Sequence, residues 1–352
     1  MLRCCDAAML TCALNAFLGR YAAIDTSDGA GMNMMDLKEQ KWSDDVLNAT
    51  AAGLASKLEP VVPAHTALGP ISQYFQQEYG FAPGCRVVAW SGDNPNSVAG
   101  LGLRNPGDVG LSLGTSDTIF SIMDAETSSP GLEGHIFVNP VDPDSHMAML
   151  CYKNGSLARE VVRDRVASGS WDTFDSMIAS TPAGNNGNIG FFIDQPEIIP
   201  DIPVAGVRRF DASGAAVASF DPAVEARAVV EGQMLSMRLH TKALGLEPKM
   251  IIATGGGSAN KSITKIMADV FGSPVLASSQ TDSASLGAAL RAYHGWMCEE
   301  DHEFVPYAEA TAGCAAMNYT TVAEPSADAH ATYTEMLDTY KSLEDGVVAS
   351  CQ

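Results

Sequence analysis

The order of the strands and helices expected after Asp108 restricts the possible folds of this chain more than any other feature. Two short apolar runs flank a turn of small residues and predict a β-hairpin, and a third strand follows before the first helix. With the two helices between the third and fourth strands counted as one, the order β-β-β-α-β-α-β-α differs from the strict alternation of a doubly wound sheet. The strands are expected at 109–113, 118–123, 147–152, 250–253 and 274–277, and the helices at 156–166, 222–244, up to 271, and 282–296.

This order is that of the ribonuclease-H-like α/β fold, which actin, Hsp70 and the sugar kinases use. With 352 residues the chain exceeds the usual size of one hydrophobic core, so we expect two domains, residues 1–107 and 108–352. The first is predicted to contain a Gly/Asp-rich loop that includes Asp25, Asp28, Gly29 and Gly31 and ends at Trp42. The remaining expectations are helices within 7–18, 45–58, 71–79 and 331–343, a buried strand at 86–90, and an irregular segment at 181–203.

The charge of the chain argues against polyanionic partners. It carries 42 acidic and 21 basic side chains, a net charge of −21, so its surface repels nucleic acid and anionic lipid. We therefore expect neither nucleic acid nor membrane as a partner. The eight cysteines are scattered without a CxxC pair, which is typical of reduced thiols and predicts a cytoplasmic protein.

Three turns of small residues each follow an expected strand. They lie at 92–94 (Gly-Asp-Asn), 114–116 (Gly-Thr-Ser) and 255–260 (Gly-Gly-Gly-Ser-Ala-Asn). Strand ends and helix N-termini meet at one edge of an α/β sheet, and ligands bind there. The three turns together therefore predict a ligand site, and the carboxylate of Asp93 is exposed at one of them.

Each turn also has a simpler interpretation. Gly92-Asp93-Asn94-Pro95 is typical of an ordinary Asx turn, and Gly114-Thr115 of a hairpin turn. The third turn, with Lys261 and Ser262 after it, differs by one residue from a phosphate-binding P-loop, or serves only close packing of a helix on a strand. Trp171 is by default a packing residue. No histidine has a metal-ligand spacing, so no metal ligand is predicted.

Six segments resemble the FGGY family of carbohydrate kinases, in particular the branch that acts on xylulose. The similarity runs from the first residues to about Trp296. It is carried by IDTSDGAGMN (24–33), VVAWSGDNPNSVAGLGL (87–103), GDVGLSLGTSDTIF (107–120), LEGHIFVNPVD (132–142), KNGSLARE (153–160) and IIATGGGSANKSITKIMADVFGSPV (251–275).

The resemblance implies two ribonuclease-H-like domains that clasp ATP, with Mg²⁺, and D-xylulose between them, and transfer of phosphate to give D-xylulose 5-phosphate. By resemblance, Asp93 is the general base that takes the proton of the sugar C5 hydroxyl, and Asn94 holds a neighbouring hydroxyl. A carboxylate at a strand end is a suitable acceptor for that proton. The residues implied in ATP binding are Gly114, Thr115, Trp171, Gly256, Gly257 and Asn260.

The sequence also departs from the family pattern. The family's opening strand with an Asp-x-Gly-Thr hairpin, and a histidine and an arginine that grip the sugar, have no counterpart in this chain. Residues 1–107 are therefore expected to be the C-terminal remnant of a truncated sugar-binding domain. Three alternatives remain open: a catalytically incomplete nucleotide-binding fragment, a kinase for another pentulose or polyol, and a P-loop NTPase.

Overall fold

The computed structural model describes residues 13–126, 133–278, 282–314 and 317–351. Part of the first expected helix, 7–12, lies outside these residues, and its remainder is helical at 13–18. Among the helices in the described ranges, none is both long and apolar enough to cross a lipid bilayer.

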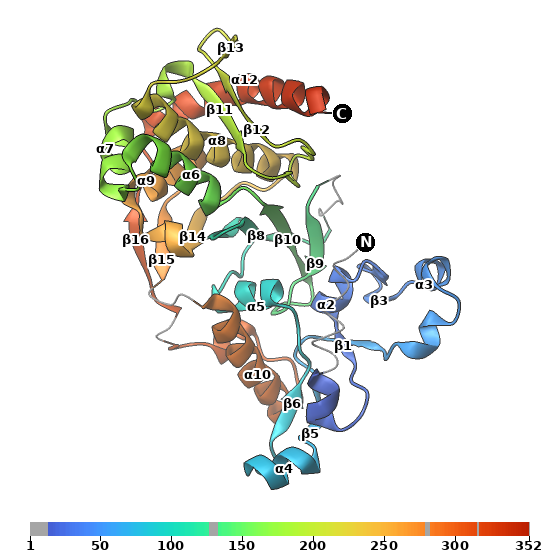
Figure 1. Ribbon diagram of the computed structural model, residues 1–352. Helices are drawn as coiled ribbons and strands as arrows, with labels where there is room; N and C mark the ends of the chain where they lie inside the picture. Colours follow the sequence, from blue (N-terminus) through green and yellow to red (C-terminus); the bar gives the residue numbers. More distant parts are fainter. Residues whose placement is uncertain (1–12, 127–132, 279–281, 315–316, 352) are drawn as a thin grey trace.

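The fold is built around a central mixed sheet (Figure 1). Within the described residues this sheet has seven strands in the order β16-β15-β14-β7-β8-β10-β9. The pairs β7–β8 and β8–β10 are antiparallel, whereas β14 is parallel to β7 and to β15. This arrangement confirms the ribonuclease-H-like prediction. The strands are β7 (Asp108–Leu113), β8 (Asp117–Asp124), β9 (His135–Val138), β10 (Ser145–Tyr152), β14 (Met250–Thr254), β15 (Val275–Ser278) and β16 (Tyr319–Ala323).

The central strands are apolar on both faces because helices cover both. Leu111 and Ile251 face the core formed with α8, α9 and α12, whereas their sequence neighbours Gly110 and Ile252 turn to the opposite face, where Val98 of α5 packs. These helices are α5 (Asp93–Gly100), α6 (Ser156–Ala167), α7 (Trp171–Ala179), α8 (Pro222–Ala243), α9 (Lys261–Phe271), α10 (Ser283–Asp301), α11 (Tyr307–Ala310) and α12 (Ala327–Cys351).

Some elements differ from the sequence-based expectations. The segment 181–203 was expected to be irregular, but it contains the fully buried strand β11, which pairs with β12. The first part of the expected loop is helical, because the Asp25 carboxylate accepts from the backbone N–H of Asp28 and caps α2. The helix expected over 45–58 ends at Thr50, since Ala51 is extended, and a separate 3₁₀ turn begins after the left-handed Gly53. The elements concerned are α2 (Thr26–Gly31), α3 (Asp44–Thr50), the 3₁₀ turn η1 (Leu54–Lys57), β11 (Ile189–Ile193), β12 (Gly206–Phe210) and β13 (Ala216–Val217).

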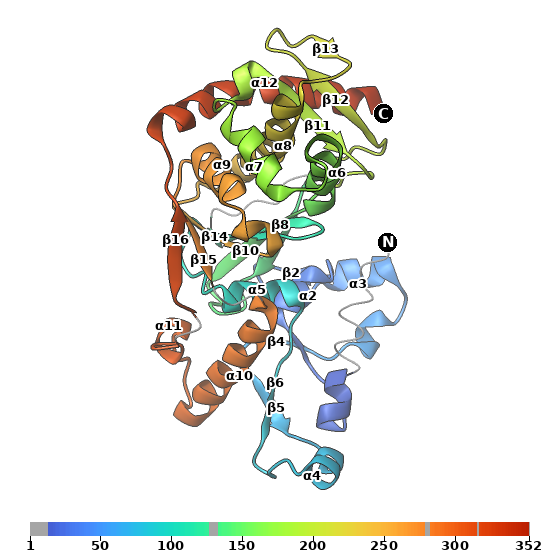
Figure 2. The ribbon, with the colours of Figure 1, turned by 60° about the vertical axis from the view of Figure 1, so that its left-hand side comes forward.

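The described residues before β7 form a smaller region below the central sheet. Its short strands pair in twos, and α10 lies alongside β6 and α5 (Figure 2). A segment from the C-terminal part of the chain therefore packs into the N-terminal region. The elements of this region not yet given are β1 (Ile24–Asp25), β2 (Met35–Asp36), β3 (Lys41–Trp42), β4 (Val61–Val62), β5 (Ala67–Pro70), α4 (Gln73–Tyr79) and β6 (Arg86–Val88).

Helices α5 and α10 meet backbone to backbone. A Cβ atom on Gly287 would lie 1.7 Å from the carbonyl oxygen of Asn96, so only glycine permits this approach. On the next turn of α10, the buried Arg291 donates to Asn96 Oδ1 at 2.8 Å and to Asp25 Oδ2 at 3.1 Å. These contacts fix α5, whose first residue is Asp93, against α10.

A buried histidine joins α12 to α8 and makes stability depend on pH. His240 contacts Glu133 Oε2 through Nδ1 at 2.5 Å and Glu344 Oε2 through Nε2 at 3.1 Å. Burial alone lowers the pKa of His240, but the two carboxylates outweigh burial and raise it to about 9.

We expect this imidazolium to stabilise the folded state fully below pH 6.5, the usual histidine pKa. The contribution, about 3 kcal/mol, is lost as the pH rises from 6.5 to 9, since the folded state then holds a proton that the unfolded state does not. Urea denaturation at pH 6 and pH 9 measures it. His240→Gln should flatten the pH dependence, and His302→Asn, at an exposed position, should not; an unchanged slope in His240→Gln contradicts the assignment.

Candidate functional site

A cavity of about 730 Å³ lies where β7 and β14 end and α6, α7 and α9 begin. Its volume is in the range of sites that bind small molecules. Two of the three predicted turns line it, together with Trp171. All the residues that the sequence analysis connected with ATP are among its lining residues: Gly114, Thr115, Trp171, Gly256, Gly257 and Asn260.

The two turns touch through Leu113, the last residue of β7. A Cβ atom on Gly257 would lie 2.9 Å from Leu113 Cβ, and one on Gly255 would lie 2.5 Å from the Leu113 carbonyl oxygen. Gly255 also has a φ of 80°, which disfavours other residues. The glycines therefore serve both close packing of the turns and an open cavity wall.

The cavity is electrostatically suited to an anion despite the acidic chain. Of the helices that the structure describes, α6, α7 and α9 begin at cavity residues, namely Ser156, Trp171 and Lys261. The N-terminus of a helix carries a partial positive charge and free backbone N–H groups. Figure 1 shows these helices on the same side of the sheet. Their first turns favour a negatively charged ligand.

The side chain of Asn260 stabilises the turn at 255–260 with two hydrogen bonds. Its Oδ1 accepts from the backbone N–H of Ile263 at 3.0 Å and caps α9, while its Nδ2 donates to Asp175 Oδ1 at 2.8 Å. The residues before it form a 3₁₀ turn, η3 (Gly256–Ala259), within a ribonuclease-H-like sheet. The P-loop interpretation is therefore not favoured.

A buried arginine lies beneath both turns. Arg159 lines the cavity and is only 1% exposed; it donates to both carboxylate oxygens of Asp117 at 2.6 and 3.0 Å, and to Gln233 Oε1 at 2.8 Å. Burial raises the pKa of Asp117, and Arg159 opposes that shift. The backbone N–H of Ser156 donates to the Gly114 carbonyl at 2.8 Å, so the start of α6 and the Gly114–Thr115 turn are held together.

Trp171 is partly buried and contacts two neighbours. The Arg163 guanidinium lies 4.6 Å from the centre of its ring, and Phe174 packs against it in a T-shaped arrangement. The ring is thus fixed by packing and still lines the cavity. The two interpretations of Trp171, packing and ligand contact, are compatible.

Asp93 and Asn94 are not among the lining residues of this cavity. They begin α5, after Gly92 at the N-cap, and the exposed Asp93 carboxylate accepts from the Asn94 backbone N–H at 2.8 Å. A Cβ atom on Gly92 would lie 3.5 Å from Asp28 Oδ1, so a second carboxylate is close to this turn. The structure therefore brings the turns at 114–116 and 255–260 together and leaves the Asp93 turn outside their cavity.

Comparison with known proteins decides the family. The sequence profile of the C-terminal domain of the FGGY family of carbohydrate kinases matches residues 109–296, more than half of the chain. The chain belongs to the FGGY family of carbohydrate kinases. The earlier resemblance is thereby confirmed.

Curated relatives of this FGGY chain include xylulose kinases. It is 50% identical to xylulose kinase 2 of Arabidopsis thaliana over 301 residues, which are 82% of this chain and 54% of the relative. It is 46% identical to the xylulose kinase of Mus musculus over 343 residues, which are 97% of this chain and 60% of the relative. The chain thus spans little more than half the length of these relatives.

Solved structures of other sugar kinases share the fold of this FGGY chain. Ligand-bound xylulose kinase from Lactobacillus acidophilus superposes with a TM-score of 0.81 at 20% identity, covering 97% of this chain and 67% of that one. Gluconate kinase from the same organism gives a TM-score of 0.78 at 19% identity, covering 96% and 67%. At these identities the likeness concerns the fold alone.

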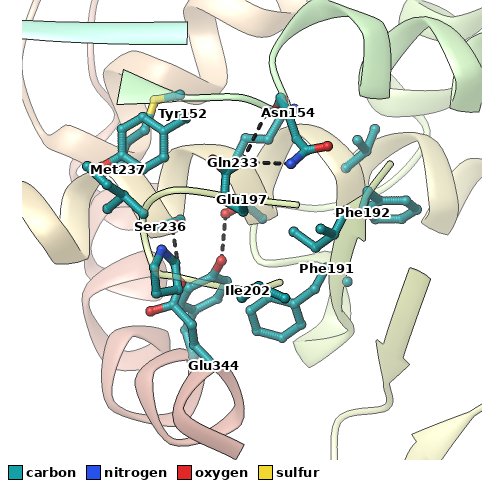
Figure 3. Close-up of a pocket in the computed structure, with 17 residues that line it drawn as sticks. Tyr152, Asn154, Phe191, Phe192, Glu197, Ile202, Gln233, Ser236, Met237 and Glu344 are labelled. Atoms are coloured by element: carbon teal, nitrogen blue, oxygen red, sulfur yellow. Dashed lines mark hydrogen bonds between the residues drawn. The ribbon is translucent and has the colours of Figure 1, made fainter. Parts of the chain in front are cut away.

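A second, much smaller cavity lies inside the C-terminal region of this FGGY chain, between α8, α12 and β11 (Figure 3). Its volume is about 40 Å³, enough for a few water molecules at roughly 10–15 Å³ each. The Tyr152 hydroxyl lines it and has no hydrogen-bond partner among the described residues. Burial raises the pKa of Tyr152 well above its usual value. This cavity is too small for a nucleotide.

Sequence reasoning missed Arg159, Asp117 and Asp175. Arg159 and Asp117 lie within the segments that carried the family resemblance, but their pairing joins a helix to a strand 42 residues away. Asp175 follows Trp171 by four residues on a helix, and that spacing places both on one face. The spacing was the one available signal for Asp175.

Proposed function

We propose that this protein transfers the γ-phosphate of ATP to D-xylulose and forms D-xylulose 5-phosphate. The observation that carries the proposal is the single cavity that joins both glycine turns, Trp171 and the starts of α6, α7 and α9. The xylulose kinases among its relatives support the choice of sugar.

In this proposal the larger cavity holds ATP. The Gly114–Thr115 turn and the start of α6 bind the β- and γ-phosphates through backbone N–H groups. Gly256 and Gly257 let the adenosine lie against the backbone, and Trp171 flanks it. Asn260 acts mainly by capping α9 and holding the third turn in place.

Asp93 is proposed as the general base. Its carboxylate takes the proton from the C5 hydroxyl while the C5 oxygen forms a bond to the γ-phosphorus and the bond from that phosphorus to the β-phosphate oxygen breaks, releasing ADP. Asn94 holds a neighbouring sugar hydroxyl. Asp93 is not a lining residue of the nucleotide cavity, so the sugar bound at Asp93 and the γ-phosphate of ATP must meet between α5 and the cavity.

Mg²⁺ is proposed to enter with ATP. No group of three or more His, Cys, Asp or Glu side chains among the described residues is arranged to hold a metal ion. This fits the usual mode of Mg²⁺ in kinases, in which phosphate oxygens and water supply most ligands and protein carboxylates one or two. When bound, the ion neutralises charge on the phosphates.

The domain division, the partners and the location of the protein are also part of the proposal. The proposed domains are a sugar-binding domain up to residue 107 and a nucleotide-binding domain from residue 108. Both turns that line the cavity lie in the second of these, which supports the division. Helix α10 of the second domain packs on α5 of the first. The partners are small molecules, ATP and D-xylulose, with neither nucleic acid nor membrane, as the net charge of −21 favours. The scattered cysteines support a cytoplasmic location.

ADP release by the purified protein tests the proposal. With ATP and Mg²⁺, we expect ADP to form when D-xylulose is added and not with glycerol, gluconate or no sugar. ATP binding without sugar-dependent ADP release would support the nucleotide-binding alternative instead. Faster turnover with another pentulose or a polyol would replace D-xylulose as the substrate.

A further inference from the structure

Asp175 is an acidic residue that lines the nucleotide cavity, and the proposed reaction gives it no role. It lies in the second turn of α7, lines the nucleotide cavity and follows Trp171 by four residues. Residues four apart on a helix share a face, so the carboxylate and the indole border the same part of the cavity. No role for Asp175 follows from the proposed transfer itself.

The carboxylate of Asp175 is held in place. Asn260 Nδ2 donates to its Oδ1 at 2.8 Å, and Asn260 is itself fixed because its Oδ1 caps α9 at Ile263. A carboxylate has about four acceptor positions on its two oxygens. One of them is used by Asn260, and the residue lines the cavity with acceptor positions to spare.

The negative charge of Asp175 limits which part of ATP this side chain can contact. A carboxylate repels the phosphates of a nucleotide, which are attracted to helix N-termini and backbone N–H groups. The uncharged part of ATP, in contrast, carries hydrogen-bond donors: the ribose hydroxyls and the amino group of adenine. An oriented acceptor beside Trp171 matches these donors and gives no contact to a phosphate.

We infer that Asp175 is a specificity-determining residue that accepts a hydrogen bond from an N–H or O–H donor of the nucleoside. The inference rests on the proposed binding of ATP in this cavity. It explains why the amide of Asn260 serves two partners at once: it caps α9 and orients the acceptor. The contact adds to affinity and discriminates against nucleotides without the donor.

Calorimetry of nucleotide binding tests the inference on the whole chain without relying on turnover. Asp175→Asn keeps the size of the side chain and an oxygen for Asn260, but removes the charge and turns an NH₂ group toward the ligand. We expect ATP to bind at least about tenfold more weakly, as for loss of a hydrogen bond to a charged group. Asp172→Asn is the matched control, since Asp172 is exposed on the same helix and does not line the cavity.

Two ATP analogues identify the donor. Purine riboside triphosphate lacks the adenine amino group, and 2′-deoxy-ATP lacks one ribose hydroxyl. The analogue that lacks the donor should bind the natural protein about tenfold more weakly than ATP, and Asp175→Asn should not distinguish it from ATP. Equal ATP affinity in Asp175→Asn and the natural protein overturns the inference, as does analogue discrimination that survives the substitution. Absence of ATP binding to the natural protein overturns the proposed function with it.

Discussion

Asp93→Asn is expected to lower the rate of phosphate transfer to D-xylulose by about 10²- to 10⁴-fold, the usual contribution of a general base. An amide is isosteric with the carboxylate but cannot take the proton of the sugar hydroxyl. The affinity for ATP should stay within twofold of that of the natural protein, because Asp93 is not a lining residue of the nucleotide cavity. Initial rates of ADP formation and calorimetry with ATP separate these effects.

The matched control for Asp93→Asn is Asp44→Asn. Asp44 is likewise exposed at the first position of a helix, α3, so both substitutions remove one negative charge from a helix N-terminus. Asp44→Asn should leave transfer unchanged. A rate near normal in Asp93→Asn would contradict the assignment of the base, and equal losses of ATP affinity and rate would indicate that Asp93 acts on the nucleotide.

Arg159→Met should have the largest effect on stability. The substitution leaves Asp117, which is fully buried, without its charged partner, and breaking a buried ion pair in this way usually costs about 3–5 kcal/mol. It also removes the donor to Gln233, which itself donates to the Asn154 carbonyl at 2.7 Å. Urea denaturation, followed by circular dichroism, measures the loss in the free energy of unfolding.

Two further variants test whether the unpaired charge of Asp117 causes the instability of Arg159→Met. Asp117→Asn combined with Arg159→Met removes both charges and should recover much of the loss, because no uncompensated charge is then buried. Lys341→Met breaks the exposed pair with Asp345 and should change the free energy of unfolding far less. If the double variant is as unstable as Arg159→Met alone, lost packing and not the buried carboxylate is the cause.

The central sheet was predictable because its signals are local. Each strand from β7 to β15 that the sequence analysis named is an apolar run ended by small residues, and each turn at the cavity is recognisable from its own glycines. Strand β11 was missed although its Ile-Gly-Phe-Phe-Ile run is apolar, because Gly, Asn and Pro on both sides suggested irregular structure. It is buried because it packs on α8 as well as pairing with β12.

Sequence alone therefore determined the fold class of this chain and the three turns, and it predicted six residues that line the larger cavity. Only the tertiary structure decided which side chains support that cavity. At the cavity, Asp117 and Arg159 are 42 residues apart and Asp175 and Asn260 are 85 apart; Asn96 and Arg291, which join α5 to α10, are 195 apart. Hydrogen bonds act over about 3 Å and leave no periodic pattern along the chain, so such partners become visible when folding brings them together.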